Sequence, residues 1–197
     1  SRDFPVDTLY PLASARSKGK SVQFRGKRHV VQDLSEFDFS QTKIALFSAG
    51  GDISAEYAPI AAAAGCVVID NSSYFRMDPE VPLVVPEVNP EDLDWHTKRN
   101  IIANPNCSTI QMVVALKPLH DKAKIKRVSV STYQSTSGAG RPGMDELFNH
   151  TRAVFVNDSL VREEFTKEIA FNCIPHIDAF MDDGFTKEEW KMTVETQ

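Results

Sequence analysis

The feature that most constrains the fold is an alternation of short apolar strands with a helix. Ile44–Phe47 and Val67–Ile69 are compact apolar runs, and Ser54–Ala64 between them reads as a helix. Apolar runs of this length are typical of parallel strands buried on both faces, so the alternation predicts a parallel, doubly wound sheet. The strands end in Ser48–Gly51 and Asp70–Ser73. Since ligands gather at the carboxyl ends of such strands, we expect an α/β fold with a ligand site there.

The identity of that ligand does not follow from a glycine motif. No strand of the expected sheet is followed by a G-x-G-x-x-G turn, so the sheet pattern alone does not assign a dinucleotide. Ser14–Gly19, after an expected strand at Leu9–Ala13, is rich in hydroxyl and cationic donors. Such a loop either binds a phosphate or is simply solvated. Val22–Phe24 and His29–Val31 are expected to form a hairpin.

Cys107 is expected in a turn between a strand and a helix. The apolar run Ile101–Ala103 leads into the turn, and Ile110–Leu119 leaves it with helical spacing. Ser108 or Thr109 is expected to cap the first turn of that helix. Unpaired backbone N–H groups at a helix start favour a thiolate and can hold a substrate oxyanion.

Cys107 is therefore a candidate nucleophile, but a second interpretation stays open. Free cysteine is often just a small buried hydrophobic residue. Cys66, between Gly65 and Val67, and Cys173, within an apolar stretch, are predicted to be such packing residues. Cys107 alone combines polar neighbours, a turn and a helix start.

Arg76 follows the second apolar strand and is a candidate anion clamp. The alternative is an exposed arginine whose aliphatic stem lies on Tyr74 or Phe75. Val81–Val88 is expected to be extended and bounded by proline.

The pattern changes after the cysteine. Arg127–Tyr133 alternates polar and apolar residues, which predicts an antiparallel strand with one wet face. Met144–Val154 reads as a helix after a flexible polar loop. We therefore place a domain boundary near Cys107, with domains at residues 1–106 and 107–197.

Composition excludes some classes of function. The 197 residues are 42% hydrophobic, the formal charge is −5, and no basic block is present. These values argue for a globular protein and against a general nucleic-acid or membrane-surface role. The three scattered cysteines and the absence of a signal peptide make the cytoplasm the default compartment. The histidines show no metal-ligand pairing, so we predict no metal.

Both ends of the sequence look cut. The chain opens without methionine at Ser1 and closes at Gln197 within a predicted helix. That helix starts at Thr186, with Glu189 at capping-box spacing. We expect a piece of a longer protein.

Several short stretches taken together resemble the bacterial type of aspartate-semialdehyde dehydrogenase. The resemblance runs in order over nearly the whole chain and is carried by Ser48–Gly51, Asp70–Ser73, Pro86–Asn89, Asn104–Thr109, Ser131–Gln134 and Ser137–Gly140. It implies a dinucleotide-binding domain, lacking its glycine-loop unit, followed by an α+β catalytic and dimerisation domain. It also implies a homodimer or homotetramer with its interface in the second domain.

The implied reaction is NADP-dependent and interconverts L-aspartyl 4-phosphate with L-aspartate 4-semialdehyde and phosphate. This step serves the biosynthesis of diaminopimelate, lysine, threonine and methionine. By this resemblance Cys107 attacks the acyl phosphate, expels phosphate and forms a thioester that accepts hydride from the nicotinamide.

The resemblance also implies roles for other residues. Gln134 orients the substrate at the cysteine, Arg76 and Asn106 hold the phosphate, and Glu195 meets the substrate amino group. The implied cofactor-binding residues are Arg16 and Ser17 for the ribose phosphate, with Ser48, Ala49, Gly50, Gly51, Ser137 and Gly138 along the dinucleotide.

Relative to this family, the chain departs at both ends. The family's first strand with its glycine-rich loop would precede Ser1, and its catalytic histidine and a substrate-binding arginine would follow Gln197. We therefore expect the chain to be the central part of the enzyme and to be inactive by itself.

Three other functions are alternatives to this one. N-acetyl-glutamyl-phosphate reductase also uses a cysteine after an asparagine–proline turn, but Asn106 and the Tyr133–Gln134 pair argue against it. A cysteine hydrolase needs a paired histidine, and none lies in a comparable polar turn. The remaining alternative is a non-catalytic homologue that acts as an interaction module.

Overall fold

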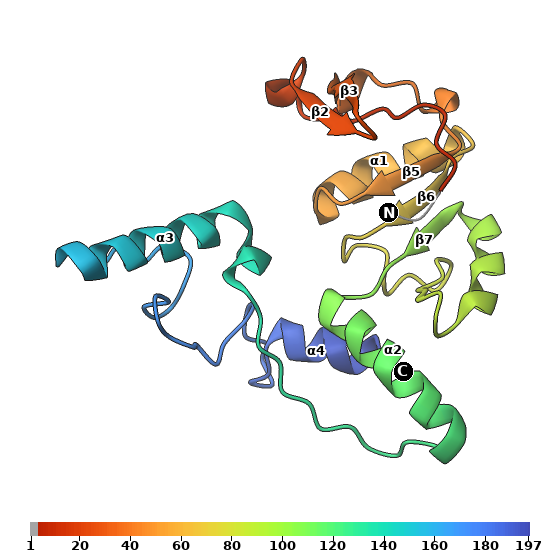
Figure 1. The fold of residues 1–197 in the computed structure, drawn as a ribbon. Coiled ribbons are helices and arrows are strands. Elements are labelled where there is room, and N and C mark those ends of the chain that lie inside the picture. Colours follow the sequence, from red (N-terminus) through yellow and green to blue (C-terminus); the bar gives the residue numbers. More distant parts are fainter. Residues whose placement is uncertain (1–3) are drawn as a thin grey trace. The chain divides into compact units, whose positions relative to one another are not determined.

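The computed structural model describes residues 4–197, which form two compact units (Figure 1). The first unit comprises the chain up to Pro82 together with Asp92–Ala103. The second comprises Leu83–Glu91 and Asn104–Gln197. The predicted domain boundary after residue 106 stays a prediction.

A parallel sheet of three strands is the centre of the first unit. Its strands are β5 (Ile44–Phe47), β6 (Val67–Asp70) and β7 (Ile101–Ala103), with β6 in the middle. Helix α1 (Gly51–Ala63) connects β5 to β6. The α/β prediction is confirmed, and so are the strands and the connecting helix.

The core of this unit lies between α1 and the sheet. Helix α1 buries small side chains at helical spacing, namely Ser54, Ala58, Ala61 and Ala62. The central strand buries Val68 completely, and β7 buries all its residues. Small residues let the helix approach the sheet closely, because little side-chain volume separates the two backbones.

Cys66 fills the end of this core, as predicted. It is fully buried, and its Sγ lies 3.2 Å from the Phe39 and 3.1 Å from the Thr42 backbone oxygen, the two backbone acceptors open to its one S–H.

Short strands and 3-10 helices make up the rest of the first half of the chain. The hairpin of β2 (Ser21–Phe24) and β3 (Lys27–Val30) is confirmed. The strand predicted at Leu9–Ala13 was too long: β1 covers only Leu12–Ala13, because its parallel partner β4 is Gln32–Asp33. The 3-10 helices are η1 (Ala15–Ser17), η2 (Leu34–Glu36), η3 (Phe39–Gln41) and η4 (Pro90–Lys98).

The second unit is built from helices and irregular segments. Its helices are α2 (Cys107–Ala123), η5 (Thr136–Ala139), α3 (Gly140–Val156) and α4 (Lys187–Val194). Helices α2 and α3 extend beyond the predicted ranges at both ends. At α4 both halves of the predicted capping box form between Thr186 and Glu189.

The antiparallel strand predicted at Arg127–Tyr133 was wrong. The segment is irregular and exposed, with Tyr133 at 88% exposure. A strand needs a hydrogen-bonding neighbour, and the described residues of the second unit contain no strand longer than an isolated bridge. None of the helices in residues 4–197 is long and apolar enough to span a membrane.

Candidate active site

Cys107 is the first residue of α2, directly after the turn that follows β7, and it is exposed. The helix cap is Asn106, not the predicted Ser108 or Thr109. The Asn106 Oδ1 accepts the backbone N–H of Ser108 at 2.8 Å. Thr109 is fully buried instead. Because the first turn of a helix carries positive partial charge, this position favours negative charge on a group bound beside the cysteine.

A buried carboxylate on α4 connects the residues around Cys107. Glu188 is 8% exposed, and its Oε2 accepts the Asn106 side-chain N–H at 3.1 Å. Its Oε1 accepts the Gln134 side-chain N–H at 2.9 Å and the Ser108 hydroxyl at 3.5 Å. Asn106 and Gln134, two residues expected at the site, therefore share one acceptor group.

Glu195 reaches the same turn from the end of α4. Its carboxylate accepts the backbone N–H of Asn106 at 2.5 Å. Glu188 and Glu195 are seven residues apart in sequence, so they lie on one face of the helix. Glu195 was expected at the site and Glu188 was not, because only Glu189 beside it matches a local motif. The seven-residue spacing was the one available signal.

A cation balances this acidic face. The Lys191 ammonium lies 2.6 Å from the Asp178 carboxylate and 3.5 Å from Glu188. Burial raises the pKa of Asp178, but hydrogen bonds from Lys191 and from the Ala179 N–H lower it by more, so that the pKa lies below its usual value. The ion pair anchors the loop before α4 to the helix.

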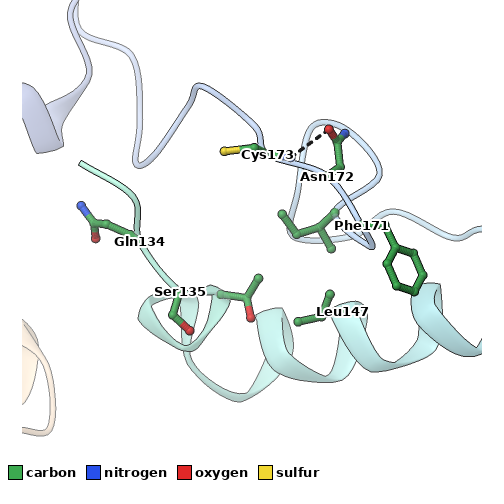
Figure 2. A pocket seen from close by; sticks show the side chains of 8 residues that line it. Gln134, Ser135, Leu147, Phe171, Asn172 and Cys173 are labelled. Carbon is green, nitrogen blue, oxygen red and sulfur yellow. Dashed lines mark hydrogen bonds between the residues drawn. The ribbon is translucent and has the colours of Figure 1, made fainter. Parts of the chain in front are cut away.

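Gln134 also lines a pocket of about 550 Å³ (Figure 2). The other lining residues are Ser135, Thr136, Leu147, Ile169, Phe171, Asn172 and Cys173. Figure 2 shows Gln134 and Phe171 at opposite ends of the pocket, with Leu147 of α3 between them. All its lining residues belong to the second unit.

The prediction that Cys173 is a packing residue was wrong. Its side chain is exposed, and its backbone N–H donates to Asn172 Oδ1 at 2.8 Å (Figure 2). The apolar stretch around it is an irregular segment that borders the pocket.

Ser137 and Gly138 lie in η5, shortly after Gln134. The Ser135 hydroxyl oxygen accepts the Ser137 N–H at 3.3 Å. Gly143 of α3 is held close to this turn: an added Cβ would lie 2.7 Å from Ala139 Cβ and 2.9 Å from the Thr136 backbone oxygen. The turn and the start of α3 therefore need glycine at position 143.

In the first unit, Ser48–Gly51 joins the carboxyl end of β5 to α1. Gly50 is the N-cap, with φ 99° and ψ 166°, and no side chain caps this helix start. A Cβ added at Gly50 would meet nothing within 4 Å. Open space beside uncapped backbone N–H groups fits the phosphates of a dinucleotide.

The neighbouring loop is held by a buried carboxylate. Asp70, at the end of β6, accepts hydrogen bonds from the Ser54 hydroxyl at 2.7 Å and from the Ser72 N–H at 2.9 Å. Arg76 lies in this loop and donates to the Asn71 backbone oxygen at 3.2 Å. Hydrogen bonds to Asp70 and from Arg76 therefore fix the conformation of the loop.

Arg16 and Ser17 lie in η1, and the Arg16 side chain is exposed. A pocket of about 360 Å³ begins at the next residue and is lined by Lys18, Gly19, Val30, Val31, Gln32, Asp33 and Glu36. Lys18 pairs with Glu36 there, and this pairing raises the pKa of Lys18.

Within residues 4–197 no group of His, Cys, Asp and Glu side chains is placed to hold a metal ion. The buried His150 has a structural contact: its Nε2 lies 2.7 Å from the Val161 backbone oxygen.

Comparison with protein families matches both parts of the chain. Residues 1–96 match the NAD binding domain of semialdehyde dehydrogenases, and residues 116–197 match the dimerisation domain of the same enzymes.

Individual relatives agree. The chain is 60% identical to aspartate-semialdehyde dehydrogenase 2 of Vibrio cholerae, over all of this chain and 58% of the relative. It is 58% identical to aspartate-semialdehyde dehydrogenase of Aquifex aeolicus, again over all of this chain and 58% of the relative.

The structure has a close counterpart as well. A crystal structure of Vibrio cholerae aspartate semialdehyde dehydrogenase II complexed with ASA matches with a TM-score of 0.96 and 60% identity. The match covers all of this chain and 58% of that one.

The chain thus spans somewhat more than half the length of these relatives. From the two matched domains and the identity over its whole length, the chain belongs to the aspartate-semialdehyde dehydrogenase family.

Proposed function

We propose that the protein to which this chain belongs reduces L-aspartyl 4-phosphate to L-aspartate 4-semialdehyde and releases phosphate. The observation that carries the proposal is the exposed Cys107 at the start of α2, beside a network that joins Asn106, Gln134 and Glu195. The relatives named above support the substrate class, and one of them is complexed with ASA. Because the chain covers 58% of the relative, the activity is assigned to the whole protein.

Cys107 is the proposed nucleophile. Its thiolate forms a bond to the acyl carbon, and the bond from that carbon to the phosphate oxygen breaks, which leaves a thioester and free phosphate. The first turn of α2 stabilises the oxyanion that forms during attack. After reduction of the acyl carbon, the carbon–sulfur bond breaks and the thiolate and the aldehyde are released.

The proposed binding roles follow from charge and hydrogen-bonding capacity. Arg76 and Asn106 hold the phosphate, and the Glu195 carboxylate complements the substrate ammonium. The Asn106 amide donates one N–H to Glu188, which leaves its other N–H for the phosphate. Gln134 orients the substrate at the cysteine.

NADP is the proposed cofactor, and its reduced form, NADPH, would supply the hydride for the reduction. Ser48–Gly51 offers backbone N–H groups to its phosphates, and Ser137 with Gly138 borders the nicotinamide. Arg16 and Ser17 bind the phosphate on the ribose, since a guanidinium pairs well with that group. The cytoplasm is the proposed compartment of the reaction.

A second copy of the chain is the proposed partner, in a homodimer or a homotetramer. The match of residues 116–197 to a dimerisation domain supports this proposal. Helix α3 presents large exposed apolar side chains, among them Phe148 at 69% and Phe155 at 78% exposure. Since these two residues are seven apart, they lie on one face of the helix, which suits burial against another subunit.

The test uses the complete protein and follows NADPH formation from aspartate semialdehyde and NADP, with and without phosphate. We expect turnover that requires phosphate and is lost in Cys107→Ala by a factor of about a thousand or more. The Cys107 side chain is exposed, so the variant should unfold at nearly the wild-type temperature. Turnover that is indifferent to phosphate or to Cys107 would reject the mechanism and favour an interaction module.

A further inference from the structure

We propose that Glu188 is a positioning residue that fixes the orientation of the Gln134 side-chain amide. This inference rests on the proposed function and deepens it, because Gln134 is the residue proposed to orient the substrate. Glu188 is buried, and it accepts hydrogen bonds from the side chains of Asn106 and Gln134.

The carboxylate of Glu188 receives donors on both of its oxygens. Gln134 Nε2 and the Ser108 hydroxyl donate to Oε1, at 2.9 and 3.5 Å. Asn106 Nδ2 donates to Oε2 at 3.1 Å, and the Lys191 ammonium lies 3.5 Å from the same oxygen. An ionised carboxylate only accepts hydrogen bonds, so only the donor end of an amide can face it.

This contact determines what Gln134 offers on its other side. Gln134 Nε2 faces Glu188. No donor among residues 4–197 reaches Gln134 Oε1, so this oxygen is left to accept a hydrogen bond from a substrate. A substrate held by Gln134 would therefore meet a carbonyl oxygen and would have to present a donor. If the amide turned over, the substrate would meet an N–H group instead.

The Asn106 side-chain amide, unlike that of Gln134, cannot turn over. Its Oδ1 accepts the Ser108 N–H as the helix cap, so its Nδ2 must face Glu188. If Glu188 became an amide, its single acceptor oxygen would be needed by Asn106. The new N–H₂ group would then face Gln134, and the Gln134 amide would have to turn over.

The variant E188Q tests this chain of consequences, since it keeps the side-chain volume and changes only the hydrogen-bonding pattern. Steady-state kinetics of the complete protein with aspartate semialdehyde, NADP and phosphate give kcat and KM separately. We expect E188Q to lower kcat/KM about tenfold or more, as a mispaired buried polar group does. The matched control is E189Q on the same turn of α4, which keeps a capping-box residue and should stay within about twofold.

Exchanging the carboxylate and the amide between positions 134 and 188 distinguishes an orienting role of Glu188 from a purely structural one. In Q134E two carboxylates face each other, so this variant should lose more activity than E188Q. In the double variant Q134E/E188Q the new amide donates to the new carboxylate, and position 134 again presents an acceptor. We expect the double variant to exceed Q134E in kcat/KM by about tenfold or more, with a higher unfolding temperature.

The outcomes are distinct from those that test the function. If the wild-type protein shows no phosphate-dependent turnover, the proposed function fails. If the wild type is active but E188Q stays within about twofold of it, the inference fails. It also fails if the double variant is no better than Q134E, a comparison that holds even if E188Q alone does not fold.

Discussion

At the scale of single residues, Gly50 has a backbone conformation that is open almost exclusively to glycine. Its φ of 99° and ψ of 166° put it where a side chain is strained even though nothing lies within 4 Å. We expect Gly50→Ala to lower the free energy of unfolding by about 1–3 kcal/mol. Denaturant titration measures this change, and fluorescence titration with NADP shows whether the turn also loses affinity.

The control is Gly51→Ala, one residue further on. Gly51 is the first residue of α1, and a Cβ there would meet only Tyr74 Cβ, at an ordinary 3.9 Å. Alanine at this position should be neutral or stabilising, because it favours the helix. Equal losses in the two variants would contradict the strain argument.

The cysteines show which residue-scale properties the sequence could predict. The exposed helix start of Cys107 and the burial of Cys66 follow from neighbours a few residues away. Cys173 was mistaken for a core residue, because exposure depends on which distant segments cover it. Glu188 was missed for a related reason: its partners Asn106 and Gln134 are 82 and 54 residues away in sequence.

At the scale of secondary-structure elements, one carboxylate holds an irregular segment to α3. Glu146 is 6% exposed and accepts the backbone N–H groups of Glu163, Glu164 and Phe165 at 3.0, 2.5 and 3.4 Å. Burial raises its pKa, but the three hydrogen bonds together lower it by more, so that the net pKa lies below 4.5. The contact therefore stabilises the folded state above that value and is lost as the pH falls through the lowered pKa.

We expect acidification to release this segment. Hydrogen-exchange protection of the Glu163, Glu164 and Phe165 amides should fall as the pH is lowered below 4.5, through the lowered pKa of Glu146. In Glu146→Gln the protection should already be low at neutral pH and should lose most of its dependence on pH. Protection that depends on pH in the same way in the wild type and in Glu146→Gln would contradict the assignment.

The helices and strands that could be predicted are those whose cause lies in the local sequence. The apolar runs of β5 and β6 gave the parallel strands, and the capping box gave the start of α4. The alternation in Arg127–Tyr133 has the same period as a strand, yet the segment is irregular. Alternation describes which faces a strand would have, whereas pairing requires a neighbour that the alternation itself does not supply.

At the scale of the whole molecule, the exposed apolar face of α3 leads to a prediction about assembly. We expect the complete protein to elute as a dimer or tetramer, and Phe148→Ser with Phe155→Ser to shift it towards the monomer. Size-exclusion chromatography with light scattering measures the mass. Trp95→Ser is the control, because Trp95 is 58% exposed but belongs to the first unit. A folded double variant that keeps the wild-type mass would place the interface elsewhere.

The division into units also has a consequence for the order of events during synthesis. The segment Leu83–Glu91 belongs to the second unit, yet it precedes β7, which pairs with β6 in the sheet of the first. A chain emerging from the ribosome therefore cannot close that sheet until Ala103 is outside the exit tunnel. Until then, one edge of β6 lacks its partner strand, and its open hydrogen-bonding groups are a site that a chaperone would cover.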